Sequence, residues 1–379
     1  MFSTSSGGVS DRHVSPCVRP GKVAGVWSLD PWVFPLTDAV TLAELGWSNF
    51  FLSQVDVDDL HDLTPARIAG VGRDRVFALS EDGLLELTLD PGMSTGEIAV
   101  GDWVLADEER HRLVQLLDRR TSFERGTEYH QGTRQLIAAN LDTLFITSSC
   151  NADFNPARLE RYLALAHDAG AVPVILLTKA DQAEDPAAYV DQAKALGRGL
   201  DAIALDAKFG EVRDVLAPWT GAGQTVALAG SSGVGKTTIA NKLTGGAAAT
   251  RDVRADDAKG RHTTTARSIH RIAGGGWLID TPGMRGLGVA DVSFGIEQTF
   301  SEITELADRC KFRNCAHESE PGCAVQAAVA AGDIDPDRLT RYKKLKHEDA
   351  VATQTIAQAR DRARKFGKVV KSAVKAKKR

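Results

Sequence analysis

A phosphate-binding loop constrains the fold of this sequence more than any other feature. Residues 230–238 read GSSGVGKTT and match the pattern G-x-x-x-x-G-K-[ST] at every fixed position. An apolar run, residues 225–229, precedes the loop and a helical pattern, residues 238–243, follows it, which is the context that this motif requires. Glycine lets backbone N–H groups surround phosphates without a Cβ clash. The sequence therefore predicts a nucleoside triphosphate site in an α/β domain.

Two side chains of this loop have expected roles. Lys236 would reach the β- and γ-phosphates, and the Thr237 hydroxyl would ligate Mg²⁺. ATPases and kinases share the loop, so it does not identify the base. The predicted phosphate-binding residues are Gly230, Ser231, Ser232, Gly233, Val234, Gly235, Lys236, Thr237 and Thr238.

Hydrophobic patterning predicts two different β architectures. Between residues 136 and 280, buried-strand runs alternate with helical stretches, which predicts a parallel sheet with crossover helices. Residues 64–127 hold short β-type runs separated by turns, which predicts a small barrel. An oligonucleotide-binding barrel and a purely structural barrel account equally well for the basic character of this segment. Its arginines include Arg73, Arg75, Arg119, Arg120 and Arg125.

At 379 residues, the chain is expected to hold two or three domains. After about Phe294 the pattern becomes helical around a group of Cys and His residues. We divide the sequence into a disordered N-terminus (1–25), an ordered extension packed on the barrel after it (26–63), the barrel itself (64–128), a nucleotide-binding α/β domain (129–298), a helical metal-binding domain (299–350) and a basic C-terminal helix or tail (351–379).

Two segments upstream of the loop are candidates for reading the base. Residues 178–181 (TKAD) follow an expected strand, and the Asp181 carboxylate could accept hydrogen bonds from guanine N1–H and its 2-amino group, which adenine cannot supply. The Lys179 stem would cover the base. Residues 206–208 (DAK) could contact the base oxygen through the backbone, although Asp206 stands where Ser is usual. The predicted base-binding residues are Thr178, Lys179, Ala180, Asp181, Ala207 and Lys208.

Two segments downstream of the loop are expected to respond to the γ-phosphate. Asp280 ends an apolar strand and could hold Mg²⁺ through water, while the Gly283 amide could sense the phosphate. One threonine of residues 263–265 could ligate Mg²⁺ only in the triphosphate state, and we select Thr264. Met284 stands where Ras-like enzymes place a water-orienting Gln. A thioether cannot orient water, so slow intrinsic turnover is expected.

The order of these motifs is permuted. Ordinary GTPases place the phosphate loop first and the base-reading motifs last. Here residues 178–181 and 206–208 precede the loop, and residues 280–283 follow it. Neighbouring termini tolerate such a permutation without a change in the sheet. The domain after the last motif could therefore be coupled to the nucleotide state.

A Cys/His group predicts a structural metal site. Cys310, Cys315, His317 and Cys323 have the spacing C-x4-C-x-H-x5-C and offer three thiolates and one imidazole, a complete tetrahedral set for one zinc ion. No open ligand position is implied, so this metal is not expected to be catalytic. Clustering of these cysteines argues against a disulfide framework and for a reducing compartment.

Charge is concentrated at the C-terminus. Net charge is −4, yet residues 338–379 hold fifteen Lys or Arg against three acids. That asymmetry predicts a segment that faces nucleic acid. The sequence has no apolar run of about 18 residues and no apolar core for a secretory signal. We therefore expect no membrane span and a cytoplasmic location.

Together, the barrel, the permuted motifs, the Cys/His group and the basic tail resemble the circularly permuted, small-ribosomal-subunit-dependent GTPase family of bacteria. The resemblance covers about residues 64–370. Its supporting stretches are GDWV (101–104), QLIAANLDTLFIT (135–147), GRHTTT (260–265), DTPGMRGLG (280–288) and EPGCAV (320–325).

The resemblance implies an oligonucleotide-binding (OB) barrel, a C-terminal zinc domain with one Zn²⁺ per chain, and Mg²⁺ with GTP. It implies a role in late maturation of the small subunit, with the 30S subunit and 16S rRNA as partners. It also implies hydrolysis of GTP to GDP that is stimulated by that particle. Separately, we expect the chain to be a monomer. His262 is similar to the family residue proposed to position water, and a solvent-exposed loop histidine explains it equally well. A nucleotide-gated RNA-binding scaffold with negligible turnover stays an alternative because of Met284. A P-loop ATPase or small-molecule kinase is disfavoured by TKAD.

Overall fold

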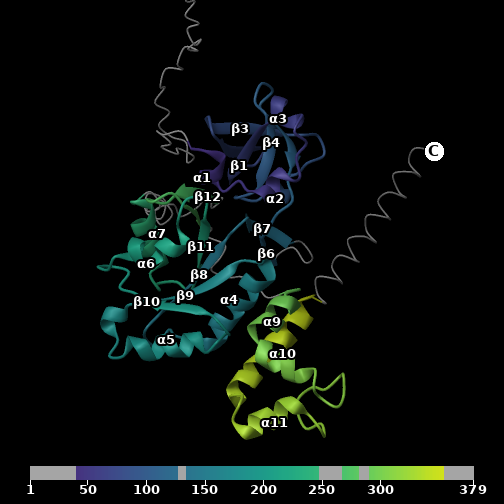
Figure 1. Cartoon of the computed structure of the whole chain (residues 1–379), viewed down its shortest axis with the longest axis vertical. Coiled ribbons are helices and arrows are strands. Elements are labelled where there is room, and N and C mark those ends of the chain that lie inside the picture. The colour runs from purple at the N-terminus through teal and green to yellow at the C-terminus, as the bar shows by residue number, and fades with distance from the viewer. Residues whose placement is uncertain (1–39, 127–133, 247–266, 281–289, 354–379) are drawn as a thin grey trace, which may run out of the picture. The chain divides into compact units, whose positions relative to one another are not determined.

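The computed structural model describes residues 40–126, 134–246, 267–280 and 290–353 (Figure 1). All of them belong to one compact unit that begins at Leu36. The segments expected to be a disordered N-terminus and most of the basic tail lie outside the described residues. No helix among the described residues is long and apolar enough to cross a membrane.

Five strands form the expected barrel. They are β1 (Thr64–Val71), β2 (Arg75–Ser80), β3 (Gly83–Leu89), β4 (Trp103–Asp107) and β5 (Arg112–Leu116). β1 pairs with β2 and β4, β2 pairs with β3, and β5 pairs with β3 and β4, so the strands close on themselves. Closure leaves no open edge, and the interior is filled with apolar side chains such as Ile68, Val76 and Leu113. The expected OB-type barrel is confirmed.

Three short helices precede the barrel: α1 (Leu42–Leu45), α2 (Asn49–Leu52) and α3 (Asp59–Asp62). Aromatic packing joins them to it, because the rings of Trp47 and Phe51 lie 4.8 and 5.6 Å from that of Trp103. The buried Arg67 guanidinium donates to the carbonyls of Leu45 (2.6 Å) and Asn140 (3.2 Å). Burial lowers the pKa of Arg67 to about 10, so the side chain is charged at neutral pH. It therefore ties α1 and the start of the α/β domain to the barrel.

The α/β domain contains the predicted parallel sheet, and its order is β10-β9-β8-β11-β13-β12. Its strands are β8 (Thr143–Ser149), β9 (Val172–Thr178), β10 (Asp201–Ala204), β11 (Thr225–Gly230), β12 (Ser268–Arg271) and β13 (Trp277–Asp280). Among these six strands the pairings are parallel, except that β12 runs antiparallel to β13. Its helices are α4 (Pro156–Ala169), α5 (Pro186–Lys194), α6 (Val212–Leu216) and α7 (Lys236–Thr244). The shared core includes Phe145, Leu176 and Ile239.

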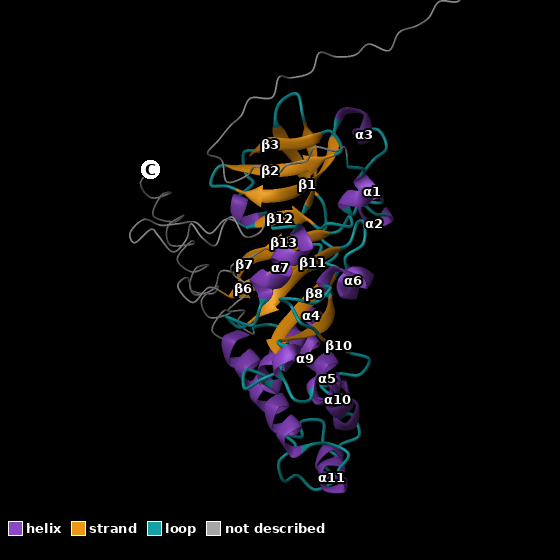
Figure 2. Cartoon of the chain, turned by 90° about the vertical axis from the view of Figure 1, so that its left-hand side faces the viewer, coloured by secondary structure: helices purple, strands orange, loops and turns teal. Residues whose placement is uncertain are grey.

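Two pairings connect this domain to its surroundings. β12 pairs with β1 at Ser268 and Gly70, so strands of the barrel and of the sheet follow one another in a single order, as Figure 2 shows from β3 through β1 and β12 to β8. β6 (Ser122–Gly126) pairs with β7 (Arg134–Ala139) in a separate two-stranded sheet. β6 comes after the barrel in sequence, but its hydrogen bonds are with β7, which leads into β8.

Residues 290–353 are mostly helical, as predicted for the chain after about Phe294. They form α9 (Ser293–Thr299), α10 (Ser301–Ala307), α11 (Ala324–Ala331) and a helix of residues 336–353, which together we call the C-terminal module. The module contacts α4 closely, because a Cβ on Gly295 would lie only 1.9 Å from the Ala164 carbonyl oxygen. Only glycine fits this approach of two helices. Three 3-10 turns complete the described elements: η1 (Thr95–Glu97), η2 (Ala180–Gln182) and η3 (Ala217–Trp219).

Candidate nucleotide and metal sites

Carboxyl ends of the parallel strands gather the predicted nucleotide motifs at one edge of the sheet. The phosphate loop leaves β11 at Gly230, which is level with Thr147 of β8. The TKAD segment begins at Thr178, the last residue of β9, and DAK comes after β10, the next strand along. Asp280 ends β13 on the other side of β11. Ligands of open α/β sheets bind at this edge, so motifs separated in sequence face one site.

The phosphate loop has the backbone that its glycines predict. Gly230, Gly233 and Gly235 have φ values of 134°, 78° and 99°. A Cβ on Gly230 would lie 2.1 Å from the Thr147 carbonyl oxygen, so only glycine fits there. Helix α7 begins directly after Gly235, which turns its first N–H groups towards the loop. The loop therefore offers backbone donors and a helix N-terminus to an anion.

Lys236 brings its charge back to the loop. Its Nζ donates to the Gly230 carbonyl at 2.9 Å and also contacts the Ser231 carbonyl. The ammonium group thus lies across the loop, where it can neutralise the charge of bound phosphates.

Thr178 joins the TKAD segment to the phosphate loop. Its buried hydroxyl donates to the Val234 carbonyl at 2.6 Å and lies 3.1 Å from the Ser148 carbonyl. Lys179 comes next with a φ of 57°, a left-handed backbone that is uncommon outside glycine and clusters at functional sites. The turn places Asp181 at the surface of η2, with its side chain exposed. This geometry fits the expected roles of Lys179 and Asp181, which stay predictions.

Asp206 gives the DAK segment a defined turn. Its Oδ1 accepts hydrogen bonds from the N–H groups of Lys208 (2.9 Å) and Phe209 (3.0 Å). A short polar side chain that bonds to its own backbone two residues on is a usual turn device. Ala207 is buried behind this turn. The departure from Ser therefore preserves an ordered loop, and contacts of Ala207 and Lys208 with a base stay predictions.

Other expected residues are only partly described. Thr237 and Asp280 are exposed at the sheet edge, one on the first turn of α7 and the other at the end of β13. His262, Thr264, Gly283 and Met284 lie outside the described residues.

Sequence reasoning missed two residues of α4 that contact the phosphate loop. Arg158 donates to the Ser231 hydroxyl and forms a 2.9 Å ion pair with Asp153. Burial raises the pKa of Tyr162, against the opposing effects of Arg158, Arg161 and a hydrogen bond from the Gly230 N–H. Nothing in the motif spacing marks these contacts, because they are tertiary. The one available signal is that positions 158 and 162 share a helical face.

The Cys/His group comes together as predicted. Side-chain ligand atoms of Cys310, Cys315, His317 and Cys323 all lie within 4.8 Å of one another. His317 Nδ1 is 3.6 Å from the Cys310 sulfur and 3.5 Å from the Cys323 sulfur, and those sulfurs are 3.9 Å apart. Four soft or borderline donors that converge on one point can hold a metal ion.

Hydrogen bonds hold the loop around this group. Glu320 accepts from the N–H groups of Glu318 and Ala316, both at 2.8 Å, and these bonds lower its pKa to about 2. His317 has a φ of 57°, and its carbonyl accepts from Gln326 Nε2 and Lys343 Nζ, both at 2.6 Å. The donors belong to α11 and to the helix of residues 336–353. This candidate metal-binding loop, residues 308–323, is thereby fixed to both helices.

Comparisons with known proteins identify close relatives. A family model described as RsgA GTPase matches residues 116–290. The chain is 57% identical over 324 residues to the small ribosomal subunit biogenesis GTPase RsgA of Mesorhizobium japonicum, covering 83% of this chain and 93% of the relative. It is 40% identical over 353 residues to the protein of the same name in Streptomyces coelicolor, covering 89% of this chain and 95% of the relative.

Two solved structures share the fold. YjeQ from Thermotoga maritima superposes with a TM-score of 0.57 at 23% identity, covering 76% of this chain and 98% of that chain. YloQ, described as a circularly permuted GTPase, superposes with a TM-score of 0.55 at 22% identity, covering 80% of this chain and 96% of that chain.

Loss of the Thr178 hydroxyl should weaken nucleotide binding. Thr178→Val keeps the shape of the side chain but leaves the Val234 carbonyl without this donor, and an unpaired buried acceptor costs enough to raise the Kd for GDP and GTP by about tenfold. Fluorescence titration measures both constants. Thr178→Ser retains the hydroxyl and is the matched control, with wild-type affinity expected. Equal Kd values for Thr178→Val and wild type would show that this contact does not support the site.

Proposed function

This chain belongs to the RsgA GTPase family, and from that premise we propose that it acts in late maturation of the small ribosomal subunit. As a family member it is a GTP hydrolase. Its relatives are named for small-subunit biogenesis, which supports the 30S subunit as the partner that stimulates hydrolysis. The single observation that carries the proposal is the convergence of TKAD with the phosphate loop through the Thr178–Val234 hydrogen bond.

Each nucleotide motif has a proposed part in hydrolysis. Asp181 reads guanine, Lys236 neutralises phosphate charge, and Thr237, Asp280 and Thr264 hold Mg²⁺ directly or through water. Mg²⁺ held by these residues would supply positive charge that offsets the charge of the phosphates during hydrolysis. Outside the described residues, Gly283 senses the γ-phosphate and His262 positions the attacking water. Met284 cannot do so, which is why we propose that a partner completes the site.

We propose that the barrel, the C-terminal module and the basic tail bind 16S rRNA. In the module, the metal-binding loop exposes Arg309, Lys311, Phe312 and Arg313, and the Lys311 ammonium lies 5.5 Å from the Phe312 ring centroid. Exposed aromatic rings flanked by cations are stacking platforms for single-stranded bases. Such charges make binding sensitive to salt. We further propose a cytoplasmic monomer whose domains begin at about residues 64, 129, 299 and 351.

We propose that the metal of the Cys/His group is zinc. Around a tetrahedral zinc ion with ordinary bond lengths, sulfur–nitrogen and sulfur–sulfur separations are about 3.6 and about 3.8 Å. Among Cys310, His317 and Cys323 the corresponding separations are 3.5–3.6 Å and 3.9 Å, and all four ligand atoms, that of Cys315 included, lie within 4.8 Å of one another. With four protein ligands the ion has no open position, so its role is to stabilise the module.

Turnover of GTP and ATP, each measured with and without 30S subunits, tests the proposed function. We expect slow GTP hydrolysis by the chain alone, a large increase with 30S subunits, and little ATP hydrolysis in either case. A preference for ATP would contradict the proposal. Tight GTP binding with no stimulated turnover would instead support the nucleotide-gated scaffold, which the missing Gln favours.

Elemental analysis of the purified chain tests the metal. One zinc per chain is expected for wild type and much less than one for Cys315→Ser, because three ligands bind zinc more weakly than four. Cys150→Ala is the matched control, since Cys150 is buried outside the group and should leave the zinc content unchanged. Full zinc retention by Cys315→Ser would contradict the assignment.

A further inference from the structure

Helix α4 contacts the phosphate loop with one face and the C-terminal module with another. Side chains four residues apart share a helical face, so Arg158 and Tyr162 project together. Arg158 contacts the start of the phosphate loop by donating to the Ser231 hydroxyl. Burial raises the pKa of Tyr162 and the Gly230 backbone opposes this larger effect, which places Tyr162 beside the same loop. Asp153 orients Arg158 through its 2.9 Å ion pair.

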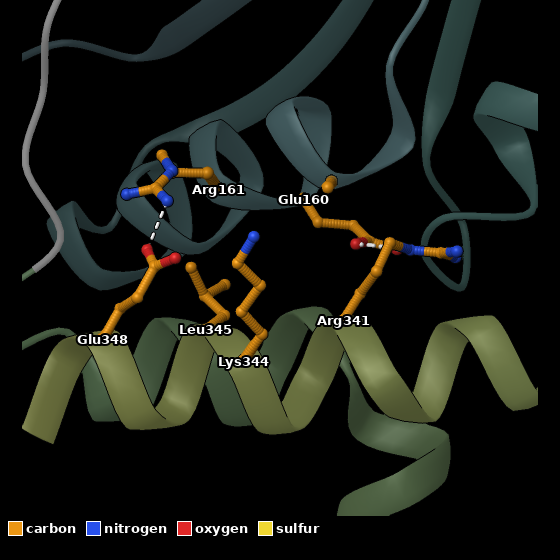
Figure 3. A pocket seen from close by; sticks show the side chains of 7 residues that line it. Glu160, Arg161, Arg341, Lys344, Leu345 and Glu348 are labelled. Carbon is orange, nitrogen blue, oxygen red and sulfur yellow. Dashed lines mark hydrogen bonds and ion pairs between the residues drawn. The ribbon is translucent and has the colours of Figure 1, made fainter.

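The other face of α4 carries a buried carboxylate. Glu160 is 1% exposed. Its Oε1 accepts a hydrogen bond from Arg338 Nη1 at 2.9 Å, and both of its carboxylate oxygens accept from Arg341 Nε at 2.9 Å. Figure 3 shows Arg341 reaching Glu160 from the helix of residues 336–353, and Glu348 of the same helix contacting Arg161. Removing one partner of a buried ion pair leaves an uncompensated charge, so this contact strongly resists separation.

Further contacts fix the module to the same helix. Arg338 also binds Glu302 Oε1 and the Thr299 carbonyl, both at 2.8 Å, which connects α9 and α10 to Glu160. Gly295 of α9 approaches the Ala164 carbonyl too closely for any side chain. Together these contacts hold the module against this face of α4.

We propose that α4 couples the phosphate loop to the C-terminal module, with Arg158 as a positioning residue that acts on bound phosphate through Ser231. Displacement of the module shifts α4 through Glu160, and α4 shifts Gly230 and Ser231. Coupling of this kind is reciprocal, so nucleotide binding also changes the position that the module prefers. The relevance of this coupling to the small subunit rests on the proposed function. If the module docks on the subunit, docking would change the phosphate loop through α4.

A double-mutant cycle tests the coupling. Arg341→Met removes one partner of Glu160 far from the nucleotide, and Ser231→Ala removes the contact of Arg158 with the loop. The Kd for a fluorescent GDP analogue is measured by titration for wild type, both single variants and the double variant. We expect Arg341→Met to raise the Kd by ~5-fold, the lower range of measured allosteric couplings, and to raise it by less than about twofold when Ser231 is already Ala.

Controls separate coupling from general damage. Arg198→Ala removes an exposed 3.0 Å ion pair with Glu305 of the same module, but Arg198 does not belong to α4, so it should leave the Kd unchanged. Glu348→Gln is a second module variant for the case that Arg341→Met does not fold. It is milder, because the ion pair of Glu348 with Arg161 is part-exposed. Its effect on the Kd should depend on Ser231 in the same way. Thermal unfolding confirms that the variants compared are folded.

Additive effects of the two changes, or no effect of either module variant on the Kd, would overturn the proposal. These measurements contain no ribosomal subunits. Their failure therefore leaves the proposed function intact, and failure of 30S stimulation leaves this coupling intact.

Discussion

The hydrogen bond from the Thr178 hydroxyl to the Val234 carbonyl is the contact on which the nucleotide site depends. It joins the TKAD segment, which we propose reads the base, to a phosphate loop that comes 56 residues later in the chain. The base and the phosphates of a nucleotide are joined through one ribose, so the two segments must lie within the reach of a single nucleotide to bind both. Pairing of β8 with both β9 and β11 brings the two segments together, and the buried hydroxyl joins them.

Permutation of the chain leaves this arrangement unchanged because the sheet, not the order of the motifs, places the loops. What permutation alters is the connection to the neighbouring modules. The α/β domain lies between the barrel and the C-terminal module in the chain, and α4 contacts the module through a buried carboxylate. The barrel touches the sheet at β12, next to β13, which ends at Asp280. Both neighbours therefore contact elements that lead to the nucleotide.

Local features of the site could be predicted from the sequence. The glycines of residues 230–235 and the spacing of Cys310 to Cys323 are short patterns whose chemistry depends on few neighbours, whereas the role of Asp181 stays a prediction. The barrel and the parallel sheet were also predictable, since hydrophobic periodicity distinguishes short β runs from alternating strands and helices. The sequence even allowed the permuted order to be recognised.

Tertiary contacts could not be predicted in this way. Arg67 is almost fully buried among carbonyls, although arginine usually indicates a surface. Glu160 and Arg158 occupy an ordinary amphipathic helix pattern, and nothing in it shows that one binds the module and the other the phosphate loop. Asp206 appeared to weaken its motif, yet its carboxylate orders the turn. Each of these depends on partners distant in sequence or on backbone geometry that composition does not encode.

Recognition of guanine by Asp181 is the central claim, and the nucleotide preference of Asp181→Asn tests it most directly. Dissociation constants for GDP and for xanthosine diphosphate are measured for wild type and for the variant. An amide in place of the carboxylate no longer matches the donors of guanine, so the account predicts that wild type prefers GDP and that the variant prefers the xanthine nucleotide. A variant that still binds GDP as tightly as wild type, and in preference to the xanthine nucleotide, would contradict the account.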